Sequence, residues 1–208
     1  MGNDPDSPES GIAGLPRSIW IRAAFVFTIL FMALHVYWAV GGTWGLPPAT
    51  LGREAEVQAA NWVVSAIMLI GALYILALDR PISRKIPSWL LLPPIWIGAV
   101  VCLSHGVFGL ATKALYLSGR HGAVNFPDLP GRSEAEVAGS NRLAAWHDLL
   151  VFEPCFILQG ALLALAAWHF IRGPAARRRW SMSIVAGTAA IDILGTALTL
   201  VGTHISIG

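Results

Sequence analysis

The chain has 208 residues, of which 55% are hydrophobic and only 12% are charged. An ordinary soluble domain carries about 25% charged residues, so this composition excludes a water-soluble protein with a single core. The net charge of +2 is also too small for the basic surface of a nucleic-acid-binding protein. The composition therefore predicts a protein that lies in a lipid bilayer.

Long uncharged runs divide the chain into membrane-spanning segments. Residues 23–52, 57–78 and 86–112 contain no Asp, Glu, Lys or Arg, and each run exceeds the roughly 18 to 20 residues that a helix needs to cross the hydrocarbon core. Two further apolar stretches follow, each with a single acidic residue. The sequence therefore predicts an all-α integral membrane bundle of five transmembrane helices, at 19–40, 60–78, 89–111, 149–169 and 183–202.

The basic residues predict how this bundle is oriented. The connections 80–85 and 172–180 are rich in Lys and Arg, whereas the connections 41–59 and 112–148 are not. By the positive-inside rule, the amino terminus is cytoplasmic and the carboxyl terminus lies outside. We expect residues 1–18 to form a disordered cytoplasmic tail and residues 19–208 to form one transmembrane domain. The long outer loop at 112–148 contains a Ser133-Glu-Ala-Glu run that indicates a short helix, and it is of the kind that often acts as a lid.

Ionisable side chains inside the expected helices are the candidate functional residues. Such groups are costly at membrane depth and normally face a protein interior or a wet cavity. At a rise of about 1.5 Å per residue, His35, His105 and Glu153 fall at one depth in the outer half of the bilayer. Asp192 lies nearer the middle, and Pro154 directly after Glu153 predicts a kink there. These positions predict a polar pocket in the outer half of the bundle.

Aromatic and hydroxyl side chains lie at helical spacing around these groups. They are the kinds of residue that line a site for an apolar ligand and place a few polar contacts on it. The candidate lining residues are Tyr37, Trp38, Trp44, Phe108, Trp146, Phe156, Thr188 and Thr196.

Purely structural roles compete with these assignments. A lone histidine in a membrane helix is often a hydrogen-bond donor to a neighbouring helix. Asp192 has hydroxyl groups on its own helix, and Asn61 or Ser65 of the second helix are further expected partners. A packing role explains Glu153 less well, because a carboxyl beside a proline at the outer boundary has no obvious partner.

One string of residues resembles a known family. The sequence His35-Val-Tyr-Trp-Ala-Val-Gly-Gly-Thr-Trp-Gly, at the outer end of the first expected helix, is similar to the first-helix motif of a family of small multi-pass actinobacterial membrane proteins of unknown function. The resemblance implies a multi-pass helical layout in the cytoplasmic membrane of a bacterium. It implies no activity, because that family has none assigned.

Three functions are compatible with these residues. The first is an isomerase, cyclase or lyase acting on a lipid or isoprenoid, in which a desolvated carboxylic acid moves a proton and aromatic faces stabilise a cation. Glu153 and Asp192 are then the acid and the base, and His35 and His105 orient the ligand or relay protons. The second is a redox protein in which the two histidines bind haem, or join His147 and Glu153 around a divalent metal. The third is a ligand-binding, transport or accessory subunit.

The expected partners follow from these functions. We expect a membrane lipid or an isoprenoid as the ligand and no nucleic acid. The acid-base function requires no cofactor, so none is predicted, while haem or a divalent metal belongs to the redox alternative. A transporter with only five helices requires a homo-oligomer.

Overall fold

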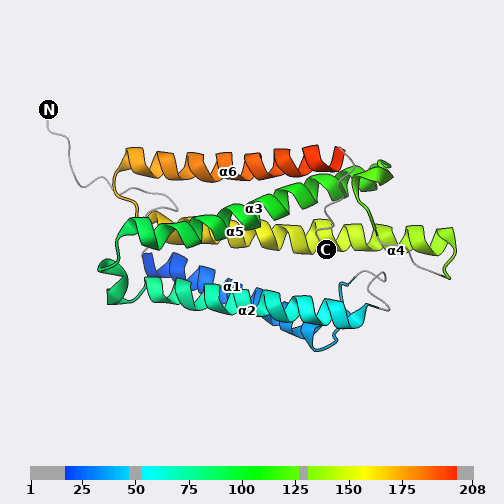
Figure 1. Cartoon of the computed structure of the whole chain (residues 1–208), viewed down its shortest axis with the longest axis horizontal. Helices are drawn as coiled ribbons and strands as arrows, with labels where there is room; N and C mark the ends of the chain where they lie inside the picture. Colours follow the sequence, from blue (N-terminus) through cyan, green and yellow to red (C-terminus); the bar gives the residue numbers. More distant parts are fainter. Residues whose placement is uncertain (1–16, 47–52, 127–130, 201–208) are drawn as a thin grey trace.

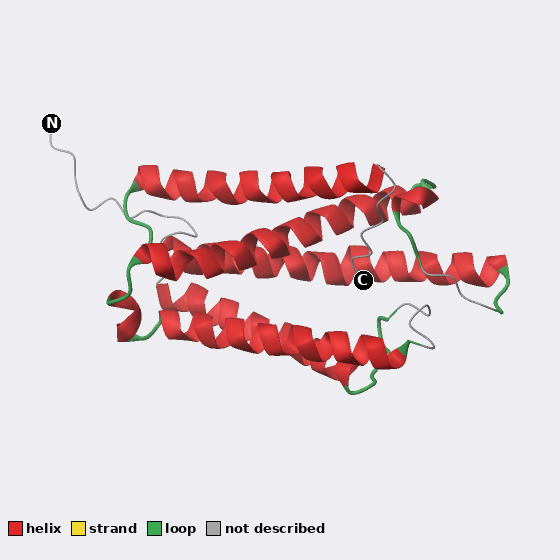
Figure 2. Ribbon diagram, viewed as in Figure 1, coloured by secondary structure: helices red, strands yellow, loops and turns green. Residues whose placement is uncertain are grey.

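The computed structural model describes residues 17–46, 53–126 and 131–200. These residues form helices and connecting loops, with no strand among them (Figure 2). The long helices are α1 (Arg17–Ala39), α2 (Glu54–Leu78), α3 (Ser88–Leu117), α4 (Glu134–His147), α5 (Glu153–Trp168) and α6 (Pro174–Leu200). Shorter elements are η3 (Pro81–Arg84), η4 (His121–Ala123) and η5 (Asp148–Phe152).

Five stretches of the described chain are long and apolar enough to cross a membrane: Ser18–Ala39, Glu54–Leu78, Ser88–Leu117, Glu134–Trp168 and Pro174–Ala197. They confirm the prediction of an all-helical protein with five apolar membrane helices. The first stretch differs from the expected span 19–40 by one residue at each end. Positions 201 and 202 of the fifth expected span lie outside the described residues, as do residues 1–16 of the expected tail.

The structure differs from the sequence expectation in the connection at 112–148. Helix α3 continues to Leu117, and α4, η5 and α5 run on from one another, so only residues 118–133 connect α3 to α4. The start of α4 is fixed by a capping box, in which Ser133 and Glu136 satisfy each other's backbone N–H groups. Residues 112–117 contain no helix-breaking residue, so α3 has no reason to end at the membrane boundary.

The helices form a layered bundle (Figure 1). Helix α5 packs along α3, α6 covers the other side of α3, and the α1–α2 hairpin contacts α5 through α1. The largest apolar core lies towards the end of the bundle where α1 begins and α2 ends, with Ile21, Leu78 and Leu91 among its buried residues. The polar residues described below lie towards the opposite end.

Glycines allow α3 and α5 to approach closely. A Cβ at Gly160 of α5 would lie 2.9 Å from the carbonyl oxygen of Ala99, and a Cβ at Gly106 of α3 would lie 2.8 Å from the carbonyl oxygen of Glu153. Small residues at such contacts let membrane helices pack backbone against backbone. The start of α5 is therefore held directly against α3.

Candidate functional site

Glu153, the first residue of α5, is buried at the contact with α3. Its exposed fraction is 5%, and its carboxyl group rests against Gly109, where any side chain would overlap it. Within the described part of the chain, Oε2 of Glu153 has no hydrogen-bond partner. This oxygen lies 3.7 Å from Nε2 of His105, which is too far for a hydrogen bond. A buried carboxyl therefore faces an imidazole without being bonded to it.

The backbone just before Glu153 forms a π-helical turn. In this turn, η5, the N–H of Glu153 donates to the carbonyl of Asp148, five residues earlier. Pro154 has no N–H to donate, so the regular pattern of α-helical hydrogen bonds is interrupted there. Turns of this kind are rare in helices and occur frequently at functional sites. The structure thus has a wider, π-helical turn directly before Pro154, at the place where the sequence predicts a kink.

An ion pair lies next to this site along the same helix contact. Nζ of Lys113 on α3 is 2.8 Å from Oδ2 of Asp148, and the two side chains are 15% and 26% exposed. Sequence reasoning missed this pair because it places both residues at the ends of an outer loop. A signal was available: His105, Gly109 and Lys113 are spaced four residues apart and share one face of a helix.

His35 of α1 is held by Asn61 of α2. Nδ1 of His35 lies 2.8 Å from Oδ1 of Asn61, while Nδ2 of Asn61 donates to the carbonyl of Val57. Oδ1 of Asn61 is an acceptor, so Nδ1 of His35 carries the proton that is donated. Nε2 of His35 is buried without a partner among the described residues. This pairing differs from the expectation that Asn61 contacts Asp192.

Two phenyl rings link the histidines at positions 35 and 105. The ring of Phe31 lies 5.2 Å from that of His35 and 5.0 Å from that of Phe156. The ring of Phe156 in turn lies 3.9 Å from that of His105. The structure therefore brings both histidines into one region, where they are joined by aromatic contacts.

The motif at the end of α1 folds back over this region. Nε1 of Trp38 donates to the carbonyl of Trp44 at 2.7 Å, and the amide of Trp44 donates to the Tyr37 hydroxyl at 3.3 Å. Gly45 has a φ of +80°, and a Cβ there would lie 2.6 Å from the ring of Phe152. The Trp38 ring also packs on Phe152, at 5.3 Å. Trp38 is buried, whereas Tyr37 and Trp44 remain exposed.

Asp192 lies on a different side of α3. It accepts a hydrogen bond from the Ser104 hydroxyl, and its backbone carbonyl accepts one from Thr196 at 2.8 Å. Ser104 precedes His105 in α3, and consecutive residues of a helix point about 100° apart. Within the described chain no hydrogen bond or ion pair joins Asp192 to Glu153. The two carboxyl groups are therefore not brought into one pocket.

The remaining candidate lining residues lie either near the two histidines or near Asp192. Phe108 lies beside α6, because a Cβ at Gly195 would be 3.7 Å from its ring. Thr188, on α6, has a buried hydroxyl without a hydrogen-bond partner in the described segments. Trp146 of α4 is 40% exposed. Among the lining candidates, Trp38, Trp44 and Phe156 belong to the region around the two histidines, whereas Phe108, Thr188 and Thr196 lie with Asp192.

A metal site was one of the alternatives. Within residues 17–46, 53–126 and 131–200, no three His, Cys, Asp or Glu side chains come together in a way that could hold a metal ion. His147 instead packs its ring against Trp44, with 6.4 Å between the ring centres. The two histidines of the haem alternative each contact a phenyl ring, His35 that of Phe31 and His105 that of Phe156.

Five apolar helices that enclose buried polar side chains define a multi-pass membrane protein. A family described as "Protein of unknown function (DUF3995)" matches residues 28–163. Because this match covers more than half of the chain, the chain belongs to that family. The matched region contains His35, His105 and Glu153 and ends before Asp192. No curated protein and no solved structure matches the chain.

Proposed function

We propose that this membrane protein catalyses proton transfer at Glu153 to and from a lipid or isoprenoid, as in an isomerisation or cyclisation. One observation carries the proposal: the Glu153 carboxyl is buried with one oxygen free of hydrogen bonds and directed at His105, 3.7 Å away. Burying such a group without a partner costs free energy. A residue that served only to pack α5 against α3 would not need a buried carboxyl with that cost. Ionisable groups in membrane helices are typically functional.

The neighbouring side chains supply what such a reaction needs. An isomerisation requires an acid that gives a proton to one carbon of a double bond and a base that takes a proton from another carbon, with no net change in atoms or electrons. Glu153 and His105 fill these two roles. The ring of Phe156, 3.9 Å from His105, offers an aromatic face to the cation formed between the two steps.

The ligand reaches this site from the outer half of the bilayer in our proposal. The two connections rich in Lys and Arg lie at the same end of the bundle (Figure 1), which supports a cytoplasmic location for that end and for the amino terminus. Glu153 lies towards the other end. The His105 side chain is 28% exposed, so the Glu153–His105 pair is open to an apolar ligand on one side.

Deuterium exchange tests the proposal. Purified protein is incubated in D2O with the total lipid extract of the membrane in which it was made, and the lipids are analysed by mass spectrometry for deuterium bound to carbon. We expect exchange with the wild-type protein and a loss of about 100-fold or more in Glu153→Gln. Asp192→Asn is the matched control and keeps the activity.

Two results would contradict the proposal. The first is wild-type protein that exchanges no deuterium into any lipid. The second is exchange that survives in Glu153→Gln at the wild-type rate. Thermal unfolding of each variant in detergent shows whether a loss of exchange reflects chemistry or misfolding.

A further inference from the structure

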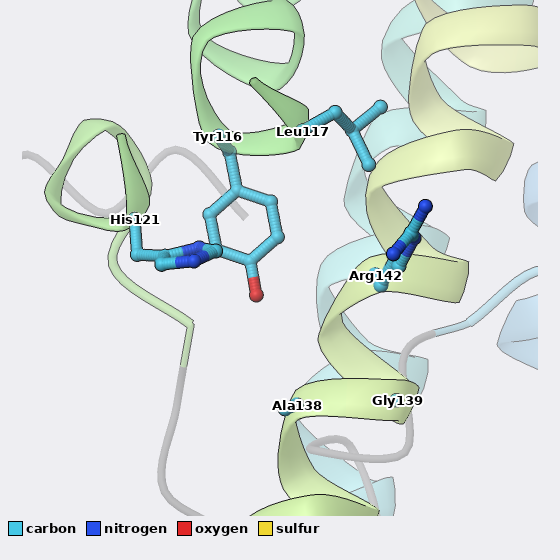
Figure 3. A pocket seen from close by; sticks show the side chains of 6 residues that line it. All are labelled: Tyr116, Leu117, His121, Ala138, Gly139 and Arg142. Atoms are coloured by element: carbon cyan, nitrogen blue, oxygen red, sulfur yellow. The ribbon is translucent and has the colours of Figure 1, made fainter. Parts of the chain in front are cut away.

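A surface cavity lies where α3 ends beside α4. Its volume is about 300 Å³, and it is lined by Tyr116, Leu117, His121, Ala138, Gly139 and Arg142 (Figure 3). A second cavity of about 550 Å³ adjoins it and shares Tyr116, His121 and Ala138. Both cavities therefore lie between the end of α3, η4 and α4.

The lining of the first cavity favours an anion. Arg142 contributes a positive charge to it, and none of its described lining residues is acidic. Figure 3 shows the hydroxyl of Tyr116 turned towards the space beside α4, the side chain of Arg142 lying over α4 on the other side of that space, and the His121 ring against that of Tyr116. Arg142 forms no ion pair with any of the described residues. A planar guanidinium that is free to donate two parallel hydrogen bonds suits a phosphate group.

The charges that line the second cavity largely cancel. Arg132 and Glu134 line it, and Arg132 also pairs with Glu136 at 3.4 Å. The unpaired positive charge therefore belongs to the first cavity, beside Arg142.

The position of the cavity along the bundle points to a membrane ligand. The 35-residue stretch Glu134–Trp168 is about 52 Å long, whereas the hydrocarbon core is about 30 Å thick. The first turns of α4 therefore project beyond the hydrocarbon. Trp146, exposed and one turn from Arg142, is of the type that lies at the membrane interface. Arg142 is thus placed at the level of lipid headgroups.

The cavity also lies in line with Glu153. The Tyr116 ring packs on Phe126 at 4.9 Å, and Phe126 lies 5.8 Å from Nζ of Lys113, which pairs with Asp148 beside the Glu153 site. Arg142 and Glu153 are about 16 Å apart along their helix. A ligand held by its headgroup at Arg142 can therefore extend an apolar chain to the depth of Glu153.

We infer that this cavity binds the phosphate headgroup of a membrane amphiphile, with Arg142 as the cationic contact and the Tyr116 hydroxyl as a donor. The inference rests on the proposed function in one respect only, which is that this amphiphile is the substrate of Glu153. Binding of the headgroup requires no chemistry, so the two can be tested apart.

The test compares three probes in a phosphate-free maltoside detergent by titration calorimetry: farnesyl phosphate, farnesol and inorganic phosphate. We expect farnesyl phosphate to bind at least about tenfold more tightly than either of the others, because only it combines the charged contacts with an apolar chain. Arg142→Gln should weaken its binding about tenfold or more. Arg178→Gln, a change at an exposed arginine near the start of α6, is the matched control and leaves binding unchanged.

The outcomes separate this inference from the proposed function. Equal affinity in Arg142→Gln and wild type, or no binding of farnesyl phosphate, would overturn the headgroup site. Inorganic phosphate that binds as tightly as farnesyl phosphate would assign the cavity to free phosphate and overturn the membrane ligand. Intact binding of farnesyl phosphate without deuterium exchange in the wild-type protein contradicts the proposed chemistry alone.

Discussion

Gly109 of α3 lies directly against the carboxyl group of Glu153 of α5, so closely that a Cβ at position 109 would overlap both carboxyl oxygens. The location of this buried acid is thus set by the space that a glycine leaves. Hydrogen bonds contribute less, since Oε2 has no partner among the described residues. The close packing of α3 against α5, and not a network of hydrogen bonds, therefore mainly determines where the Glu153 carboxyl lies.

Gly109→Ala tests this fit. The added methyl group must displace the Glu153 carboxyl or push α3 away from α5, so we expect a loss of about 1–3 kcal/mol in the free energy of unfolding. Lipid deuterium exchange should fall with it. Gly71→Ala on α2 is the control, because a Cβ there meets nothing within 4 Å; it should be neutral or stabilise by up to about 1 kcal/mol. Gly109→Ala with wild-type stability and exchange would show that the contact does not position Glu153.

The Lys113–Asp148 ion pair should show strong coupling between its partners. Lys113→Met and Asp148→Asn each leave the other group without its partner in a largely buried place, which should cost about 1–3 kcal/mol. The double variant should lose clearly less than the sum of the two. Chemical unfolding in detergent measures all four proteins. Additive losses would mean that the pair contributes nothing to stability.

The five membrane helices could be predicted because a helix that crosses the hydrocarbon core requires a long run of uncharged residues. The same signal fails outside the membrane. Helix α4 is polar and has no hydropathy signature, so the Ser133-Glu-Ala-Glu run predicts only a short helix at its start, where the structure has the capping box of Ser133 and Glu136. The predicted outer loop at 112–148 was too long for this reason.

The depth of each candidate site residue in the membrane could be predicted from the sequence, but the face of the helix on which it meets a neighbouring helix could not. Counting residues from the helix ends places His105 and Glu153 at one level, and the structure brings them within 3.7 Å. Depth does not determine which face of a helix meets which neighbour. Asp192 therefore has Ser104 as its partner, and Asn61 pairs with His35, although neither pairing follows from position along the chain.

The hydrogen bond between His35 and Asn61 predicts a particular tautomer. Because Asn61 accepts through Oδ1, the neutral His35 ring should carry its proton on Nδ1. Nitrogen-15 NMR of histidine-labelled protein in lipid bilayers reports this directly. Asn61→Leu should change the His35 signals and lower stability by about 1 kcal/mol, while the signals of the exposed His121 stay unchanged. A His35 ring protonated only on Nε2 would contradict the assignment.

Ser104→Ala should distinguish the role of the Asp192 carboxyl from that of the Glu153 carboxyl. It removes the donor to Asp192 and leaves a partly buried carboxyl without that bond, so we expect stability to fall by about 1–3 kcal/mol. Asp192→Asn keeps an oxygen that the Ser104 hydroxyl can reach, so it should cost less. Neither change touches the face of α3 that meets Glu153, and lipid deuterium exchange should persist in both folded variants. If Ser104→Ala stayed folded yet lost exchange as completely as Glu153→Gln, Asp192 and Glu153 would act as one site, contrary to their placement on different sides of α3.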